Sequence, residues 1–98
     1  MRTMLRFEID TEAGNELIRS GEMEKGLDQM LEMLQPEAAY FFASDGHRGG
    51  ILVFDLTDPS RLPSLTEPLW MSLKARVEMC PAMNRDDLKS GLAALRQQ

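Results

Sequence analysis

Residues 38–56, AAYFFASDGHRGGILVFDL, contain the pattern that decides the fold. Two short segments, Ala38–Ser44 and Ile51–Leu56, are rich in aromatic and branched residues, which is typical of β-strands. The residues between them, Asp45–Gly50, include three glycines and an aspartate, as turns commonly do. The stretch therefore predicts an antiparallel hairpin.

Both faces of this predicted hairpin are apolar. In its first strand Tyr40 and Phe42 point to one side and Ala39 and Phe41 to the other, and residues 51–54 repeat the pattern. A sheet with one face in water alternates apolar and polar residues instead. We therefore expect a second covering layer, supplied by the C-terminal helix, a second subunit or both. A homodimer is the simplest solution, because most soluble oligomers are closed and symmetric.

Outward from the hairpin, the N-terminal half predicts one strand and a broken helix. Thr3–Asp10 alternates apolar and charged residues, which indicates a strand. Residues 11–35 change to helical spacing, with an interruption at Ser20-Gly21 and an apolar stripe from Met23 to Leu34. Pro36 closes this segment.

The C-terminal half predicts two helices around one strand. Asp58-Pro59 is a helix start, and Pro63 and Pro68 predict two short helical pieces rather than one rod. Arg76–Met83 is a weaker strand that Pro81 restricts to a sheet edge. Asn84 then caps a last amphipathic helix, whose leucines are Leu88, Leu92 and Leu95.

The order strand, helix, strand, strand, helix, strand, helix predicts an α+β fold. Its first six elements are the ferredoxin-like βαββαβ arrangement, with an antiparallel four-stranded sheet of order 4-1-3-2 and a C-terminal helix appended. Residues 1–98 form a single domain with no internal repeat.

Composition excludes several classes of protein. The chain has 11 basic and 16 acidic residues, a net charge of −5, whereas nucleic-acid binders are usually basic. Cys80 is the one cysteine, so no intramolecular disulfide forms, and no apolar segment reaches the length of a membrane span. With no secretory leader among the first ten residues, we expect a cytoplasmic protein without nucleic-acid or membrane partners.

Four motifs resemble those of small bacterial proteins of the dimeric α+β barrel superfamily. They are Glu37-Ala38-Ala39-Tyr40-Phe41, Val53-Phe54-Asp55, Glu67-Pro68-Leu69 and Val77-Glu78-x-x-Pro81-x-Met83-x-x-x-Asp87-Leu88. Muconolactone isomerase and antibiotic-biosynthesis monooxygenases share that architecture, in which two sheets pack face to face. The resemblance implies a fold and a dimer, and no family's catalytic residues map one by one onto this chain.

Two functional hypotheses follow. In the first, a homodimer binds a small organic molecule between sheet and helices, as a binding protein or as a cofactor-free isomerase or oxygenase. In the second, the chain is a non-enzymatic module for self-association or for binding a protein partner. A closed pocket favours the first, and a fully packed interface favours the second.

Arg6 and Glu8 are the candidate catalytic residues. They share the face of the first strand opposite Leu5, Phe7 and Ile9, where a charge must be paired or hydrated. In the functional interpretation, Arg6 anchors an anionic ligand and Glu8 acts as acid or base. In the structural interpretation, which we favour, Arg6 forms an ion pair with Glu8 or with Glu78 on a neighbouring strand. The predicted ligand-binding set is Arg6, Glu8, Tyr40, Phe42, Trp70 and Glu78.

Other chemistry finds little support. The sequence has no phosphate-binding loop, dinucleotide fingerprint or zinc motif, so we expect no cofactor and no metal site. A Cys80–His47 nucleophilic pair requires the hairpin tip to lie near the edge strand, which nothing in the sequence indicates. Segment 45–50 has two cations and three glycines, and we interpret it as a solvated hairpin tip rather than as an anion site.

Overall fold

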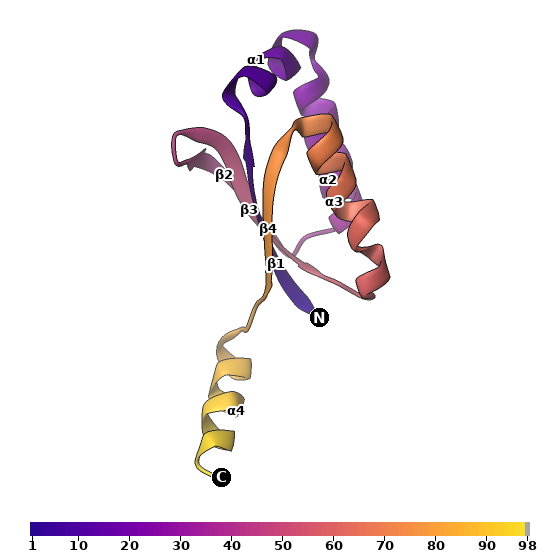
Figure 1. The fold of residues 1–98 in the computed structure, drawn as a ribbon. Coiled ribbons are helices and arrows are strands. Elements are labelled where there is room, and N and C mark those ends of the chain that lie inside the picture. The colour runs from indigo at the N-terminus through magenta and orange to yellow at the C-terminus, as the bar shows by residue number, and fades with distance from the viewer. Residues whose placement is uncertain (98) are drawn as a thin grey trace.

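The computed structural model describes residues 1–97 and shows an α+β fold of ferredoxin-like topology (Figure 1). The strands pair antiparallel in the order β2-β3-β1-β4, which confirms the predicted order read from the other edge. The elements are β1 (Arg2–Ile9), α1 (Thr11–Ser20), α2 (Glu22–Leu34), β2 (Ala38–Ser44), β3 (His47–Asp55), the 3-10 turn η1 (Pro59–Arg61), α3 (Leu62–Leu73), β4 (Ala75–Pro81) and α4 (Arg85–Leu95).

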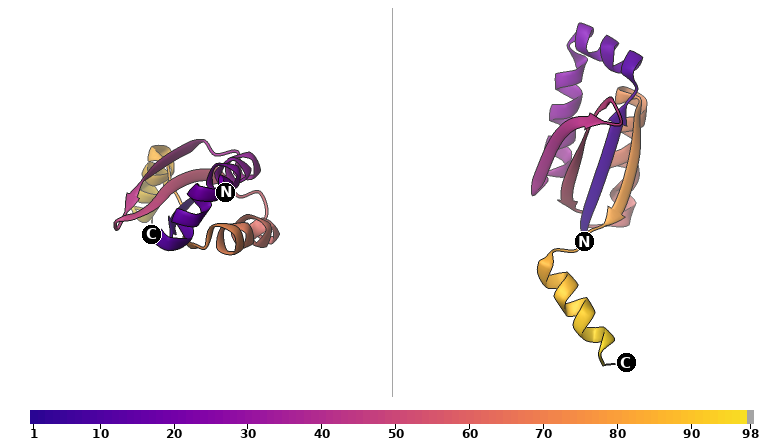
Figure 2. Two further views of the ribbon diagram at one scale, coloured as in Figure 1. Left: turned by 90° about the horizontal axis from the view of Figure 1, so that it is seen from above. Right: turned by 90° about the vertical axis from the view of Figure 1, so that its left-hand side faces the viewer.

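Helices cover one face of the sheet only. The views show α2 and α3 packed along the same side of the strands and α1 above their end (Figures 1 and 2). The core lies between these two layers, where Leu5, Phe7, Leu52 and Phe54 are at most 1% exposed. We call the opposite side, which carries Met4, Arg6, Tyr40 and Val53 among others, the open face.

The predicted break between the first two helices is confirmed, and local chemistry explains it. The Asp10 side chain accepts a hydrogen bond from the Ala13 backbone N–H and so caps α1. Gly21 ends α1 in the left-handed conformation, with φ of 80°, which glycine adopts without steric cost. Gln35 is left-handed at the end of α2, directly before Pro36.

The hairpin turn is shorter than predicted. Only Asp45 and Gly46 form it, both with positive φ, as two-residue turns of type I′ require. His47–Gly50 already belongs to β3, so the predicted six-residue turn was wrong at four positions. Gly49 and Gly50 are strand residues. Glycine is required there because neighbouring backbone and aromatic rings occupy the space that a side chain would need.

The helix around Trp70 is also more continuous than predicted. Asp58 begins the segment as expected, and the hydrogen bonds that its carboxylate accepts from Ser60 lower the pKa of Asp58. However, α3 runs unbroken from Leu62 to Leu73 with Pro68 in its interior, so the two predicted pieces differ from the observed η1 and α3. The free energy gained by burying leucines on one side of α3 exceeds the cost of the backbone hydrogen bond that Pro68 removes.

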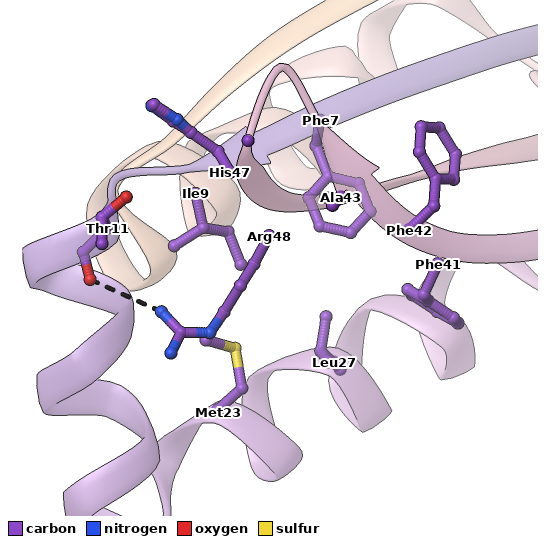
Figure 3. A pocket seen from close by; sticks show the side chains of 12 residues that line it. Phe7, Ile9, Thr11, Met23, Leu27, Phe41, Phe42, Ala43, His47 and Arg48 are labelled. Atoms are coloured by element: carbon purple, nitrogen blue, oxygen red, sulfur yellow. Dashed lines mark hydrogen bonds between the residues drawn. The ribbon is translucent and has the colours of Figure 1, made fainter.

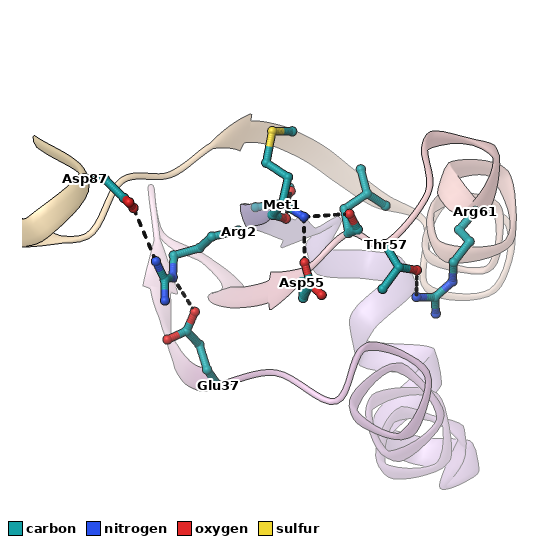
Figure 4. Close-up of polar contacts among 9 residues, drawn as sticks. Met1, Arg2, Glu37, Asp55, Thr57, Arg61 and Asp87 are labelled. Atoms are coloured by element: carbon teal, nitrogen blue, oxygen red, sulfur yellow. Dashed lines mark hydrogen bonds and ion pairs between the residues drawn. The ribbon is translucent and has the colours of Figure 1, made fainter. Parts of the chain in front are cut away.

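The C-terminal helix does not cover the open face of its own chain. It begins at the predicted Asn84 cap, where Asn84 and Asp87 form a capping box, and it projects beyond the end of the sheet (Figures 1 and 2). None of its residues is buried. The Arg2 guanidinium lies 3.5 Å from the Asp87 carboxylate and 2.6 Å from that of Glu37 (Figure 4). The hydrogen bond and the charge of Glu37 raise the pKa of Arg2.

Candidate ligand-binding site

A cavity of about 520 Å³ opens between the β2–β3 hairpin and helices α1 and α2 (Figure 3). Its walls are mostly apolar: Phe7, Ile9 and Phe41 of the sheet face Met23 and Leu27 of α2. The remaining lining residues are Thr11, Phe42, Ala43, Gly46, His47, Arg48 and Gly49. This volume is within the range of small-molecule pockets, which are typically apolar with a few polar groups.

Gly50 makes the aromatic wall of this cavity possible. It lies on β3 directly between Phe7 of β1 and Phe41 of β2. A Cβ at Gly50 would come within 3.0 Å of the Phe7 ring and 3.1 Å of the Phe41 ring. Without it, the two rings approach edge to face across β3, with centroids 6.2 Å apart. Their contact closes the sheet side of the cavity, which we call the aromatic wall.

Arg48 is the cation of the cavity. Its guanidinium extends from β3 toward α1 and donates a hydrogen bond to the Thr11 carbonyl at 3.5 Å (Figure 3). It donates a second one to the Asn15 side chain at 3.1 Å. Both acceptors are neutral. Within residues 1–97, no carboxylate lies within 4.0 Å of Arg48. Its positive charge therefore has no counter-ion beside an apolar cavity, and a bound anion would supply one.

The predicted pair Arg6 and Glu8 lies on the open face and is joined through Ser44. The Ser44 hydroxyl accepts hydrogen bonds from Arg6 at 2.6 and 3.2 Å and donates one of 2.7 Å to Glu8. The two charges are also 4.0 Å apart. Ser44 is 1% exposed, so it is a buried bridge rather than an accessible nucleophile. This network matches the structural interpretation of Arg6, with Glu8 as its partner.

The other predicted ligand-binding residues lie in two places, the open face and helix α3. Tyr40 and Phe42 belong to the open face, where the Arg6 guanidinium stacks 5.9 Å from the centroid of the Phe42 ring. Glu78 is on the same face, but its nearest cation is Arg76, at 3.5 Å. Trp70 is half exposed on α3, in the helix layer on the other side of the sheet. Arg6, Glu8 and Phe42 are therefore brought together, whereas Trp70 is not.

Nucleophile and metal chemistry gains no support from the described residues. Cys80 pairs with Met4 on β1, whereas Arg48, next to His47, pairs with Ile9. Met4 and Ile9 are five residue steps apart on β1, about 17 Å along the sheet. Residues 1–97 contain no cluster of three potential metal ligands, and none of their helices is long and apolar enough to cross a membrane.

His47 borders a second, smaller hollow at the turn end of the open face. This hollow has a volume of about 350 Å³ and is lined by residues of both charges: Glu8, Ile9, Asp10, Asp45, His47, Lys74 and Arg76. The Nδ1 atom of His47 is buried and has no hydrogen-bond partner in the described structure. Its mixed charges define no ligand class, so the larger cavity is the stronger candidate.

Comparison with known proteins adds no assignment: neither the family models nor the curated proteins give a match to this chain. The site is therefore defined by its own geometry.

Sequence reasoning missed the cavity mainly because Arg48 was placed in a solvated turn. Its place in β3 puts the side chain on the helix side, and the alternation of β3 from Leu52 back to Arg48 was the available signal.

Proposed function

We propose that this chain is a small-molecule-binding protein that takes an organic acid in the cavity between sheet and helices. The observation that carries the proposal is the Arg48 guanidinium beside apolar walls, which donates hydrogen bonds to two neutral acceptors and has no carboxylate within 4.0 Å among the described residues. An acid with an aliphatic or aromatic body would bury that body against Phe7, Phe41 and Leu27 and place its carboxylate on Arg48. The lining side chains include no paired nucleophile and base, so binding is a better supported function than catalysis.

Replacing Arg48 by methionine should remove binding of acids and spare that of neutral analogues. Octanoate and phenylacetate, with their amides as neutral analogues, are the probes, and isothermal titration calorimetry is the measurement. A hydrogen bond to a charged group contributes about 1.5–3 kcal/mol, so Arg48→Met should weaken acid binding about 10- to 100-fold. Amide affinity should change by less than about threefold.

The matched control is Arg19→Met, which removes the same charge from an exposed arginine of α1 that pairs with Glu16. It should leave acid binding unchanged. A third variant, Arg6→Met, tests the open face. If Arg6→Met removes acid binding and Arg48→Met does not, the ligand lies on the open face at the residues first predicted. Absence of binding by both acids contradicts the proposal.

We further propose that the protein is a cytoplasmic homodimer in which a second copy of the chain covers the open face. Support comes from the open face, where Tyr40 is 68% and Phe42 42% exposed beside half-buried Ile51 and Val53. Contiguous apolar patches of this kind usually mark interaction sites. The same face favours the second candidate function, a non-enzymatic association module.

The solution mass tests this assembly. Light scattering at micromolar concentration should give twice the 11.1 kDa mass of one chain. A monodisperse particle with the mass of one chain would refute both the dimer and the self-association module. If the average mass falls on dilution, the dilution series gives the dimer dissociation constant.

A further inference from the structure

We infer that the dimer forms by exchange of C-terminal helices: α4 of each copy packs through its leucines on the open face of the other. The inference rests on the proposed homodimer and specifies how its surfaces meet. It joins two exposed apolar surfaces of the same chain, one on a helix and one on a sheet.

The helix surface is a stripe along α4. Leu88, Leu92 and Leu95 are 46, 52 and 62% exposed, and their spacing of four and three residues puts them on one side of the helix. We call these three residues the leucine stripe. A helix of 11 residues is marginal in water by itself, and a capping box adds only part of the stability it needs. Packing of the leucine stripe would supply the rest.

Contacts at the base of α4 direct it away from its own open face. The Ala82 backbone N–H donates to the Arg2 carbonyl at 3.0 Å, which extends the β1–β4 pairing beyond the end of β4. Asp87, in the first turn of α4, is 3.5 Å from Arg2. The helix therefore leaves the sheet end and extends the molecule to 56 Å along its longest axis (Figure 2). A second copy is then the nearest source of an apolar sheet for the leucine stripe.

The open face has the dimensions that the helix requires. Eleven helical residues span about 16 Å. The apolar part of β2 from Ala38 to Phe42, beside Ile51 and Val53 of β3, spans about 13–17 Å along the strands. A two-fold axis would repeat the contact, so that each copy donates one helix and covers one sheet. This accounts for both unpartnered surfaces with one kind of contact.

Cross-linking between two marked chains tests the exchange. Both chains carry Cys80→Ser, which removes the native thiol; one carries Tyr40→Cys and the other, lengthened by a tag, carries Leu92→Cys. The two are refolded together and treated with a short bismaleimide. Exchange predicts a prominent product that joins position 40 of one chain to position 92 of the other, with a mass equal to the sum of the two different chains.

The alternative products have distinct meanings. If the protein is dimeric but only 40–40 products form, the sheets pack directly and the exchange is refuted while the dimer stands. If only 92–92 products form, α4 pairs with α4, which also refutes it. A particle of one-chain mass before cross-linking refutes the dimer itself.

Introducing a charge into the leucine stripe tests the helix exchange independently of cross-linking. Leu92→Glu should raise the dimer dissociation constant at least 100-fold, whereas Ser90→Glu, on the opposite side of α4, should change it less than threefold. Circular dichroism checks that both variants keep their secondary structure. Equal effects of the two substitutions would refute packing through the leucine stripe.

Discussion

Gly49→Ala should destabilise the protein by about 3 kcal/mol, a large share of the stability of a domain of this size. A Cβ at this position would lie 2.4 Å from the Phe7 carbonyl oxygen and 3.2 Å from Cβ of Ser44. The first contact is with backbone held in the β1–β3 ladder, so it cannot be relieved by rotating a side chain. Urea denaturation at one fixed chain concentration measures the loss.

Gly91→Ala is the matched control for this substitution. Gly91 is in α4, and an added Cβ there meets nothing within 4 Å in its own chain. Alanine favours a helix over glycine by about 1 kcal/mol, so this variant should be neutral or slightly stabilising. If Gly49→Ala is as well tolerated as Gly91→Ala, then β1 and β3 do not approach as closely as described.

Leu52→Ala should cost about 3–4 kcal/mol, because it leaves a cavity in the centre of the core. Leu52 is 0% exposed and lies on the helix-facing side of β3, opposite Leu5. Ile18→Ala in α1 removes a similar amount of apolar side chain from a residue that is 51% exposed, and it should cost less than about 1 kcal/mol. Similar losses for the two variants in urea would contradict the assignment of the core to the interface between sheet and helices.

The sequence predicted the order and pairing of the elements because its periodicities are strong. Buried and partly exposed residues alternate strictly along β1, Gly21 ends α1, and Asn84 caps the start of α4. Pro81 lies on the edge strand, as expected. The prediction of the turn failed because glycine occurs in turns and also at crowded positions within strands. Gly49 and Gly50 resemble turn residues, but in β3 they make room for neighbours across the sheet.

The candidate site was harder to predict because it depends on distances between elements. Arg6 and Glu8 were correctly placed on one face, yet the buried Ser44 that joins them comes from the far strand β2. The cavity requires the relative positions of α1, α2 and the hairpin, which periodicity does not specify. The position of α4 beyond the sheet also depends on contacts of its first turn with Arg2 rather than on its own pattern.

The central claim is that the cavity between sheet and helices binds an organic acid, and an NMR titration with octanoate tests it most directly. Backbone amide shifts of the 15N-labelled protein report where the probe binds. We predict saturable shifts concentrated at Phe7, Leu27, Phe41 and Arg48, which the Arg48→Met variant largely loses. Shifts confined to open-face positions such as Arg6 and Tyr40, or no saturable shifts at millimolar octanoate, would contradict the account.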